Sequence, residues 1–173
     1  MSLNKTFIFV IIFFFTISTS YAQNIAYANL DIIVKTSNVG KQIISYFDKK
    51  NQKIIKELNE KEKIIRDKEK SLISQKNILQ EEDYKKKIEV MKKEIEEYNK
   101  NSNEYSRQIE EEKDKVSKLF LIEINKVLSE YAEKNQIDMI FSSSQMLIGK
   151  SSLDVTEDIL KSVNKKITKF NIK

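Results

Sequence analysis

Residues 41–80 read KQIISYFDKKNQKIIKELNEKEKIIRDKEKSLISQKNILQ, a stretch rich in Lys and Glu that contains neither glycine nor proline. Gly and Pro cost most inside a helix, whereas Lys, Glu, Gln, Leu and Ile fill one at little or modest cost. The chain has no proline at all, and its only two glycines are Gly40 and Gly149. The sequence between them therefore predicts very long helices, which hold too little apolar surface to bury a large core.

Apolar side chains recur every seven residues along this stretch, which is the spacing of a coiled-coil seam. One column contains Ile44, Asn51, Leu58, Ile65, Leu72 and Leu79. Its companion contains Phe47, Ile54, Lys61, Lys68 and Gln75. The seam is complete at its start and has only one apolar residue per heptad farther along.

The heptad pattern restarts after the acidic residues 81–83. The new columns contain Ile88, Ile95, Ser102, Ile109 and Val116, with Met91, Tyr98, Tyr105, Glu112 and Leu119 beside them. A chain folded back near residues 81–85 would set Leu79 near Ile88 or Met91, Leu72 near Ile95 or Tyr98, and Leu58 near Ile109. One uninterrupted helix in a parallel coiled coil is the alternative, because no Gly or Pro marks the turn.

Apolar patterns of a different kind flank the helical stretch. Residues 25–30 predict a strand, followed by Asp31 as a helix cap and a short helical turn. Residues 120–131 predict a core-facing helix, and residues 137–141 and 145–148 predict a hairpin of two further strands. Asp154 and Thr156 can cap a last helix.

The predicted fold is thus α+β but mostly α, with a long antiparallel helical-hairpin arm inserted in a small β-containing body. Residues 23–39 form the first strand and the start of the body, residues 40–119 the arm, and residues 120–173 the rest of the body. A small body with long arms is poorly stabilised alone, and we expect an oligomer interface to supply the missing apolar burial.

Residues 1–22 have the layout of a secretory signal: Lys5, an apolar run over residues 7–17, and a small-x-small site that ends at Ala22. The apolar run is shorter than the roughly 20 residues that span a hydrocarbon core, which argues against the alternative of an uncleaved anchor. Cleavage after Ala22 removes Lys5 and lowers the formal net charge from +5 to +4. We expect an exported, basic product.

The chain has no cysteine and no histidine. Disulfides, thiolate zinc sites and the Ser-His-Asp and Cys-His nucleophilic arrangements therefore lack a required member. The carboxylates alternate with Lys in the pattern of a solvated helix face. The sequence predicts neither an enzyme nor a cofactor.

Three segments carry a resemblance to a known family. NIAYANL at residues 24–30, NQIDMIF at 135–141 and DVTEDIL at 154–160, in that order around a charged helical hairpin, resemble the Skp (OmpH) family of periplasmic chaperones. The resemblance covers essentially the whole mature chain. Its most specific parts are the two segments after the arm, because the arm itself is a generic coiled coil.

The resemblance implies a homotrimer whose strands assemble a body and whose helical hairpins surround a cavity. Such proteins are ATP-independent holdases of the periplasm, which bind unfolded outer-membrane β-barrel proteins, prevent their aggregation and aid their delivery to the outer membrane. The chain has no Gly-rich phosphate loop, which agrees with that expectation. Anionic lipid or lipopolysaccharide surfaces are a further candidate partner.

Candidate residues follow for three roles. The candidates for contact with a client protein are Ile64, Ile73, Ile78, Met91, Tyr98 and Tyr105. The basic arm candidates are Lys85, Lys86, Lys87, Lys92 and Lys93, although pairing with neighbouring Glu on a solvated helix explains any single lysine equally well. The candidates for the oligomerisation body are Ile25, Tyr27, Leu30, Ile137, Met139, Ile140, Phe141 and Leu147.

Two other functions compete with the holdase. A structural coiled-coil spacer of the cell envelope would favour a complete seam, whereas Asn51, Lys61 and Lys68 interrupt this one. Nucleic-acid binding is suggested by the isoelectric point near 9.1. Lys and Glu are interspersed rather than segregated, however, so we expect no nucleic-acid partner.

Overall fold

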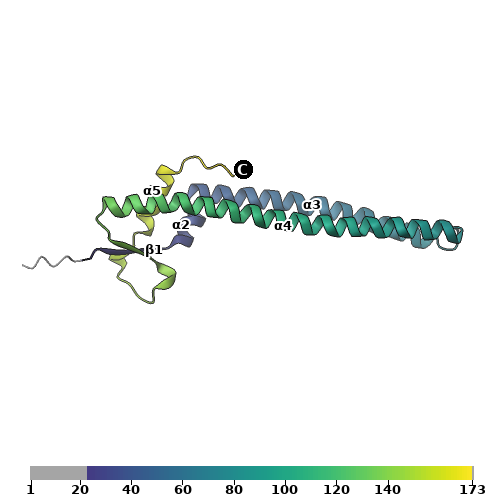
Figure 1. Cartoon of the computed structure of the whole chain (residues 1–173), viewed down its shortest axis with the longest axis horizontal. Helices are drawn as coiled ribbons and strands as arrows, with labels where there is room; N and C mark the ends of the chain where they lie inside the picture. The colour runs from purple at the N-terminus through teal and green to yellow at the C-terminus, as the bar shows by residue number, and fades with distance from the viewer. Residues whose placement is uncertain (1–22, 173) are drawn as a thin grey trace, which may run out of the picture.

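The computed structural model describes residues 23–172, so the predicted signal segment lies outside the described residues. Helices α3 (Asn38–Ser74) and α4 (Glu81–Lys134) form an antiparallel hairpin that projects from a small body (Figure 1). The body contains strands β1 (Ile25–Ala28) and β2 (Met139–Ser142) with helices α2 (Leu30–Thr36) and α5 (Thr156–Lys166). The predicted class, mostly α with a small β part, is confirmed, and the uninterrupted-helix alternative is wrong.

The turn at the end of the arm spans residues 75–80, earlier than the predicted turn near residues 81–85. The backbone amides of Ile78 and Leu79 both donate to the carbonyl oxygen of Gln75, each at 3.0 Å. Glu81, Glu82 and Asp83 instead form the first turn of α4. Carboxylates are stabilised there by the unpaired amides and the positive end of the helix dipole, so the acidic patch marks a helix start.

The register of the hairpin is set by three side-chain contacts between its helices. Lys50 pairs with Glu112, Lys68 with Glu94, and Lys87 donates to Gln75. From one contact to the next, the residue number on α3 rises by as much as the residue number on α4 falls. This register places Leu58 opposite residue 104, so the predicted Leu58–Ile109 pairing is wrong by more than one helical turn, as the earlier turn requires.

The seam of the arm is buried only near the body. Ile43 and Phe47 of α3 share a buried cluster with Val116 of α4, and Ile109 of α4 is also buried. Farther out, the side chains of the seam are only half-buried; these include Leu58, Ile65, Leu72, Met91 and Tyr98. The prediction of a firm base and a thin outer seam is therefore confirmed.

Two predicted seam positions at the base are wrong. Ile44 and Leu119 are exposed, and their neighbours Ile43 and Phe120 are buried instead. At the base, the buried apolar residues follow the 3.6-residue period of a straight helix and not the 3.5-residue period of a two-helix seam. The reason is that α2 and α5 also pack there, so the apolar face of the arm helices is wider.

The sheet consists of β1 and β2 in parallel, in register from Ile25 opposite Met139 to Ala28 opposite Ser142. The predicted hairpin of two late strands is wrong. After β2 the chain enters two 3₁₀ turns, η1 (Ser143–Gln145) and η2 (Ser151–Leu153), and residues 146–150 between them are not a strand. A short apolar run favours a strand but does not specify which strand it pairs with. Here β2 pairs with β1 and not with a later strand.

Helix α2 begins two residues earlier than the sequence indicates. The Asn29 side chain accepts from the backbone amide of Ile32 at 3.0 Å, so Asn29 is the cap and Asp31 lies in the first turn. Leu30 therefore belongs to the helix and not to the first strand. Asn29 also donates its backbone amide to the Thr156 hydroxyl at 2.9 Å, which joins the starts of α2 and α5.

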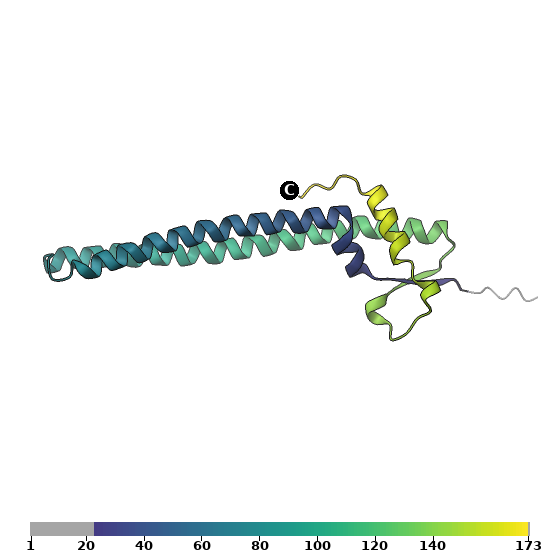
Figure 2. The ribbon, with the colours of Figure 1, turned by 180° about the vertical axis from the view of Figure 1, so that it is seen from behind.

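The core of the body lies where α2, α4 and α5 meet. Its largest fully buried side chains are Ile33, Phe120, Ile124 and Ile159, each at most 2 % exposed. Beyond α5 the tail turns back along the base of the arm (Figures 1 and 2). The Phe170 ring packs edge-on against the Phe120 ring, with 5.4 Å between the ring centroids, so the tail covers the core.

Gly40 allows α2 and α3 to meet closely in the first turn of α3. A Cβ atom at residue 40 would lie 1.7 Å from the Val34 carbonyl oxygen and 2.9 Å from the Ser37 hydroxyl. Ser37 is itself buried and caps α3 by accepting from the Gly40 amide at 3.2 Å. Only glycine fits between these groups without moving one helix.

We predict that Gly40→Ala lowers the free energy of unfolding by about 1–3 kcal/mol, because the new methyl group meets backbone rather than a movable side chain. Gly149→Ala is the matched control, since its Cβ would meet the outer atoms of Met146 and Tyr27. Urea unfolding of both variants at equal protein concentration measures the difference. Equal stability of the two variants would contradict the packing argument.

Candidate functional site

Two hollows lie end to end along one side of the outer arm. The hollow nearer the turn encloses about 400 Å³ and is lined by Lys68, Ser71, Leu72, Gln75, Lys86, Lys87, Val90, Met91 and Glu94. The other encloses about 210 Å³ and is lined by Lys61, Ile64, Ile65, Lys68, Glu94, Glu97, Tyr98 and Asn101. We call these two hollows together the arm groove.

An ion pair separates the two hollows of the arm groove. The Lys68 ammonium lies 2.8 Å from both carboxylate oxygens of Glu94, and both residues line both hollows. On either side the floor is apolar, with Leu72 and Met91 toward the turn and Ile65 toward the body. The groove thus offers apolar contact area at two neighbouring places with charge between them.

Three of the six client-contact candidates line the arm groove. Ile64 and Tyr98 line the hollow nearer the body and Met91 the other. Val90 also lines the groove and is 58 % exposed, yet sequence reasoning missed it because it lies outside the heptad columns. Its position directly before Met91 could have placed it at the rim of the seam.

The other three client-contact candidates lie elsewhere. Ile73 follows Ile64 by nine residues, which is two and a half helical turns, so the two side chains leave opposite sides of α3. Ile78 is exposed in the turn of the arm, and Tyr105 is half-buried outside the groove. The structure therefore separates a set that the sequence treats as equivalent.

The five basic arm candidates cluster near the start of α4, where neighbouring carboxylates neutralise part of their charge. Lys85 pairs with Glu81 at 2.6 Å and Lys86 with Glu82 at 3.2 Å, both on the solvated surface. Lys87 donates to Gln75 at 2.9 Å. Lys92 and Lys93 are exposed and have no ion-pair partner among residues 23–172.

The base of the arm contains a polar cluster that crosses the hairpin. The Tyr46 hydroxyl donates to Glu112 at 2.9 Å, and Lys50 pairs with the other Glu112 oxygen. The hydrogen bond from Lys50 lowers the pKa of the Glu112 carboxyl, and the same bond raises the pKa of the Lys50 ammonium. This cluster lies where the buried seam gives way to the thin outer seam.

One face of the sheet carries apolar side chains without cover. Because partners in register point to the same side, Ile25 and Tyr27 share a face with Met139 and Phe141, which we call the sheet face. Ile25, Met139 and Phe141 are exposed and Tyr27 is half-buried. Four oligomerisation candidates therefore form one surface.

The remaining oligomerisation candidates are divided. Ile140 and Leu30 are half-buried against the core, Ile137 is half-buried in the loop before β2, and Leu147 projects from the loop after β2. Sequence reasoning missed the exposed Ile44 and Leu121, which line a hollow of about 560 Å³ between α2 and the base of the arm. Ile44 was assigned to the seam, so its exposure became visible only in the structure.

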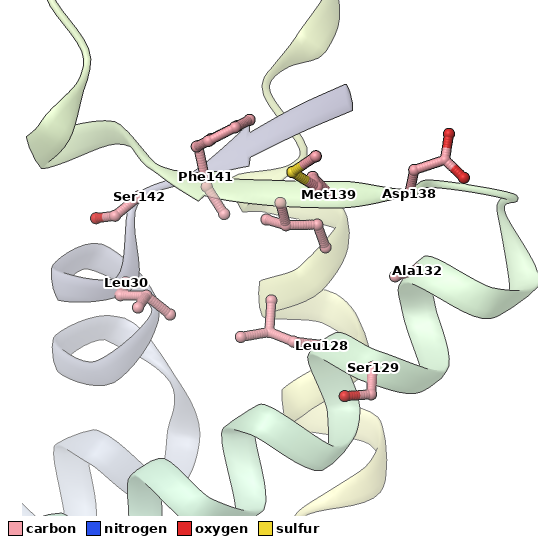
Figure 3. Close-up of a pocket in the computed structure, with 10 residues that line it drawn as sticks. Leu30, Leu128, Ser129, Ala132, Asp138, Met139, Phe141 and Ser142 are labelled. Carbon is pink, nitrogen blue, oxygen red and sulfur yellow. The ribbon is translucent and has the colours of Figure 1, made fainter. Parts of the chain in front are cut away.

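A pocket of about 230 Å³ lies between β2 and the helices beneath it (Figure 3), and Ala28 of β1 also lines it. Five successive residues, 138–142, line it from above. Leu30 and the last turns of α4 line it from below, through Leu128, Ser129 and Ala132. We call this hollow the β2 pocket.

Residues 23–172 contain no group of acidic side chains placed to hold a metal ion. Nor do they include a helix long and apolar enough to cross a membrane.

The sequence profile described as "Outer membrane protein (OmpH-like)" matches residues 24–163. The chain belongs to the OmpH-like family. The resemblance expected from the three segments around the arm is thereby confirmed. No curated protein matches the chain in sequence.

A solved structure of an OmpH-like protein has the same fold. The protein is from Caulobacter crescentus CB15 and is described as a candidate outer membrane chaperone (OmpH-like). The two superpose with a TM-score of 0.81 over 87 % of this chain and 89 % of the other, at 12 % sequence identity. At that identity the likeness concerns the fold alone.

We predict that Glu112→Gln lowers the free energy of unfolding by about 0.5–1 kcal/mol at pH 7, because Lys50 loses its charge partner while the Tyr46 hydrogen bond can remain. Solvent screening limits the loss, since the Lys50 and Glu112 side chains are 37 % and 26 % exposed. Glu111→Gln is the control, because Glu111 pairs with Arg107 on the solvated side of the same helix. Its expected cost is near zero.

The difference between wild type and Glu112→Gln should also depend on pH. Pairing lowers the folded-state pKa of Glu112 below its usual 4.5, so the stabilisation is complete above pH 4.5 and is lost as pH falls through that lower value. Urea unfolding at pH 7 and at several acidic pH values measures this loss. A difference that persisted in strong acid would show that the charge pair is not its source.

Proposed function

We propose that this OmpH-like protein is an ATP-independent holdase chaperone of the periplasm. It binds unfolded outer-membrane β-barrel proteins between its helical arms, prevents their aggregation and aids their delivery to the outer membrane. The arm groove carries the proposal, because it presents exposed Ile64 and Val90 far from the body that could otherwise cover them. Export rests on the predicted signal over residues 1–22.

The chemistry of the arm groove suits many weak contacts. β-Barrel precursors carry alternating apolar residues, which need shelter from one another rather than tight binding. Each exposed apolar side chain of the groove contributes about 1 kcal/mol on contact. Several arms acting on one client multiply such contacts and raise the overall affinity without fixing one geometry.

A homotrimer supplies those several arms. In one chain the sheet face and the hollow around Ile44 and Leu121 leave apolar surface exposed on the body. Closed assembly of identical chains would bury this surface and set the arms around a shared cavity. The trimer is part of the proposal and accounts for the small core.

Charge adds a second attraction. A basic cluster lies near the groove and consists of Lys92, Lys93 and the partly neutralised Lys85, Lys86 and Lys87. This cluster attracts acidic client segments, and the attraction is weaker at high salt. The same field acts on anionic lipid or lipopolysaccharide surfaces, where clients are delivered. A structural spacer of the envelope remains the rival function, and it requires no exposed apolar groove.

The first test mixes the purified mature protein with a urea-unfolded outer-membrane β-barrel and follows light scattering after dilution. We expect scattering to fall as the protein is added, without ATP. Unchanged client aggregation at saturating protein would overturn the holdase and leave the spacer.

A matched pair of variants tests which side of the arm binds. Ile64 and Ile73 are 55 % and 62 % exposed on opposite sides of one helix, so Ile64→Ser and Ile73→Ser remove similar surface at a similar cost. We predict that Ile64→Ser raises the concentration needed for half-maximal suppression several-fold, with Val90→Ser adding to it, while Ile73→Ser has little effect. Equal effects of Ile64→Ser and Ile73→Ser would refute the arm groove as the binding side.

The assembly is tested separately by mass in solution. We predict that wild type has the mass of three chains and that Met139→Ser with Phe141→Ser shifts it toward one chain, because both side chains lie on the sheet face. Ile55→Ser is the control, since Ile55 is similarly exposed but lies on the arm. A wild-type mass of one chain would contradict the trimer.

A further inference from the structure

The tail after α5 changes character at Ile167. The Ile167 amide donates to the Val163 carbonyl oxygen at 2.8 Å and the Ile167 side chain is only 8 % exposed, so the start of the tail is fixed. Residues 168–172 belong to no helix or strand. They run outward from α5 along the base of the arm (Figures 1 and 2). The contacts of this irregular segment with the base therefore depend chiefly on its side chains.

Two apolar side chains hold the segment against the molecule. Phe170 and Ile172 are half-buried and pack against the buried core cluster, whereas Asn171 between them is exposed. The Phe170 ring meets the Phe120 ring edge-on, and Phe120 is only 2 % exposed. Inward side chains separated by one outward side chain are the period of an extended segment. The base of the arm thus already binds an extended segment through alternate side chains.

The contact that the tail makes has the chemistry of the proposed client contact. An unfolded β-barrel precursor presents apolar residues at every second position along its strand segments. Phe170 and Ile172 present the same pattern to the surface around Phe120. The surface under the tail therefore suits the same kind of segment that the holdase must shelter.

A bound client can compete with the tail for this surface. A segment of the same chain has a high effective concentration at its site, so a free short peptide does not readily displace it. A long unfolded client that the arm groove already holds is tethered to the molecule too, and it gains the same advantage. The two tail side chains are only half-buried, so a client segment that covers the surface more fully is favoured.

We propose that the surface around Phe120 is a second client site, which Phe170 and Ile172 occupy in the absence of client, and that an extended apolar client segment displaces them. The inference rests on the proposed holdase function and names a second place on the molecule where the same clients are held. Until a client arrives, the tail covers an apolar surface that would otherwise favour aggregation of the empty chaperone.

The absence of tryptophan from the chain allows a direct test. Phe170→Trp places the only tryptophan against Phe120, and the client is a urea-unfolded outer-membrane β-barrel whose own tryptophans have been replaced. We expect saturating client to raise the quenching of this tryptophan by acrylamide about threefold or more, because displacement moves the ring into water. Phe47→Trp is the control, since Phe47 is 5 % exposed in the buried seam and its quenching should not change.

A second variant removes the occupant of the site. Phe170→Ser with Ile172→Ser uncovers the surface without shortening the chain. Because client no longer competes with the tail, we expect the protein concentration for half-maximal suppression of client aggregation to fall about threefold or more. Lys165→Ser is the control, since Lys165 is an exposed residue in the last turn of α5, and it should act as wild type does. Urea unfolding and mass in solution show whether both variants are folded and assembled as wild type is.

The outcomes separate this inference from the proposed function. Suppose that wild type suppresses aggregation but client leaves the quenching of Phe170→Trp unchanged, or raises that of Phe47→Trp equally. The second client site is then overturned and the holdase stands. A folded Phe170→Ser, Ile172→Ser protein that is needed at the wild-type concentration or above overturns it too, because the tail then only closes the core.

If the Phe170→Ser, Ile172→Ser protein does not fold, the quenching measurement decides alone. If wild type leaves client aggregation unchanged, the second client site and the holdase are both overturned. Greater quenching at Phe170→Trp alone, together with the lower concentration for half-maximal suppression, supports the inference.

Discussion

The parallel pairing of β1 with β2 is the constraint on which the rest of the molecule depends. Parallel strands must both run the same way, so the chain that leaves the end of β1 has to return to its beginning before β2 can start. The hairpin achieves this because α4 has 54 residues and α3 has 37, and the excess, about 25 Å of helix, extends beyond the base of the arm through the body. Asn24 and Asp138 then join the two starts, with their backbone amides donating to Asp138 and Asn24 respectively. The arm is thus the connection between two paired strands, and its base is fixed by the sheet as well as by its own seam.

The distribution of apolar side chains divides this connection into two mechanical parts. At the base, Ile43, Phe47 and Val116 are buried and continue into the core around Phe120. Beyond the cluster of Tyr46, Lys50 and Glu112, the seam has too few large side chains to be covered on both flanks. Uncovered flanks are what create the arm groove, so the same sparse pattern that weakens the arm also supplies the surface proposed to hold clients. A complete seam would give a stiffer arm with less apolar surface at its sides.

The body also leaves apolar surface uncovered, on the flat sheet face and in the hollow around Ile44 and Leu121. Exposed apolar side chains of the body include Ile25, Met139, Phe141, Leu147 and Ile148. Such surface is a liability in a monomer and can be buried in an assembly of identical chains. The proposed division of roles follows from where these surfaces lie: the body associates with copies of itself through exposed apolar surface, and the arms hold unfolded chains through many loose contacts.

The sequence by itself determined the long helices and a small body built from the segments before and after the arm. It also determined the firm base and thin outer seam of the arm, and the family. These properties follow from local preferences and from periodicity, which a single chain carries in full. Only the tertiary structure decided the turn at residues 75–80, the parallel strand pair and the exposure of Ile44. Without a Gly or Pro to mark the turn, its place depends on which register best pairs the two helices, and the partner of a short strand depends on what the rest of the fold brings beside it. Both are properties of contacts between distant residues, so periodicity along the chain could not specify them.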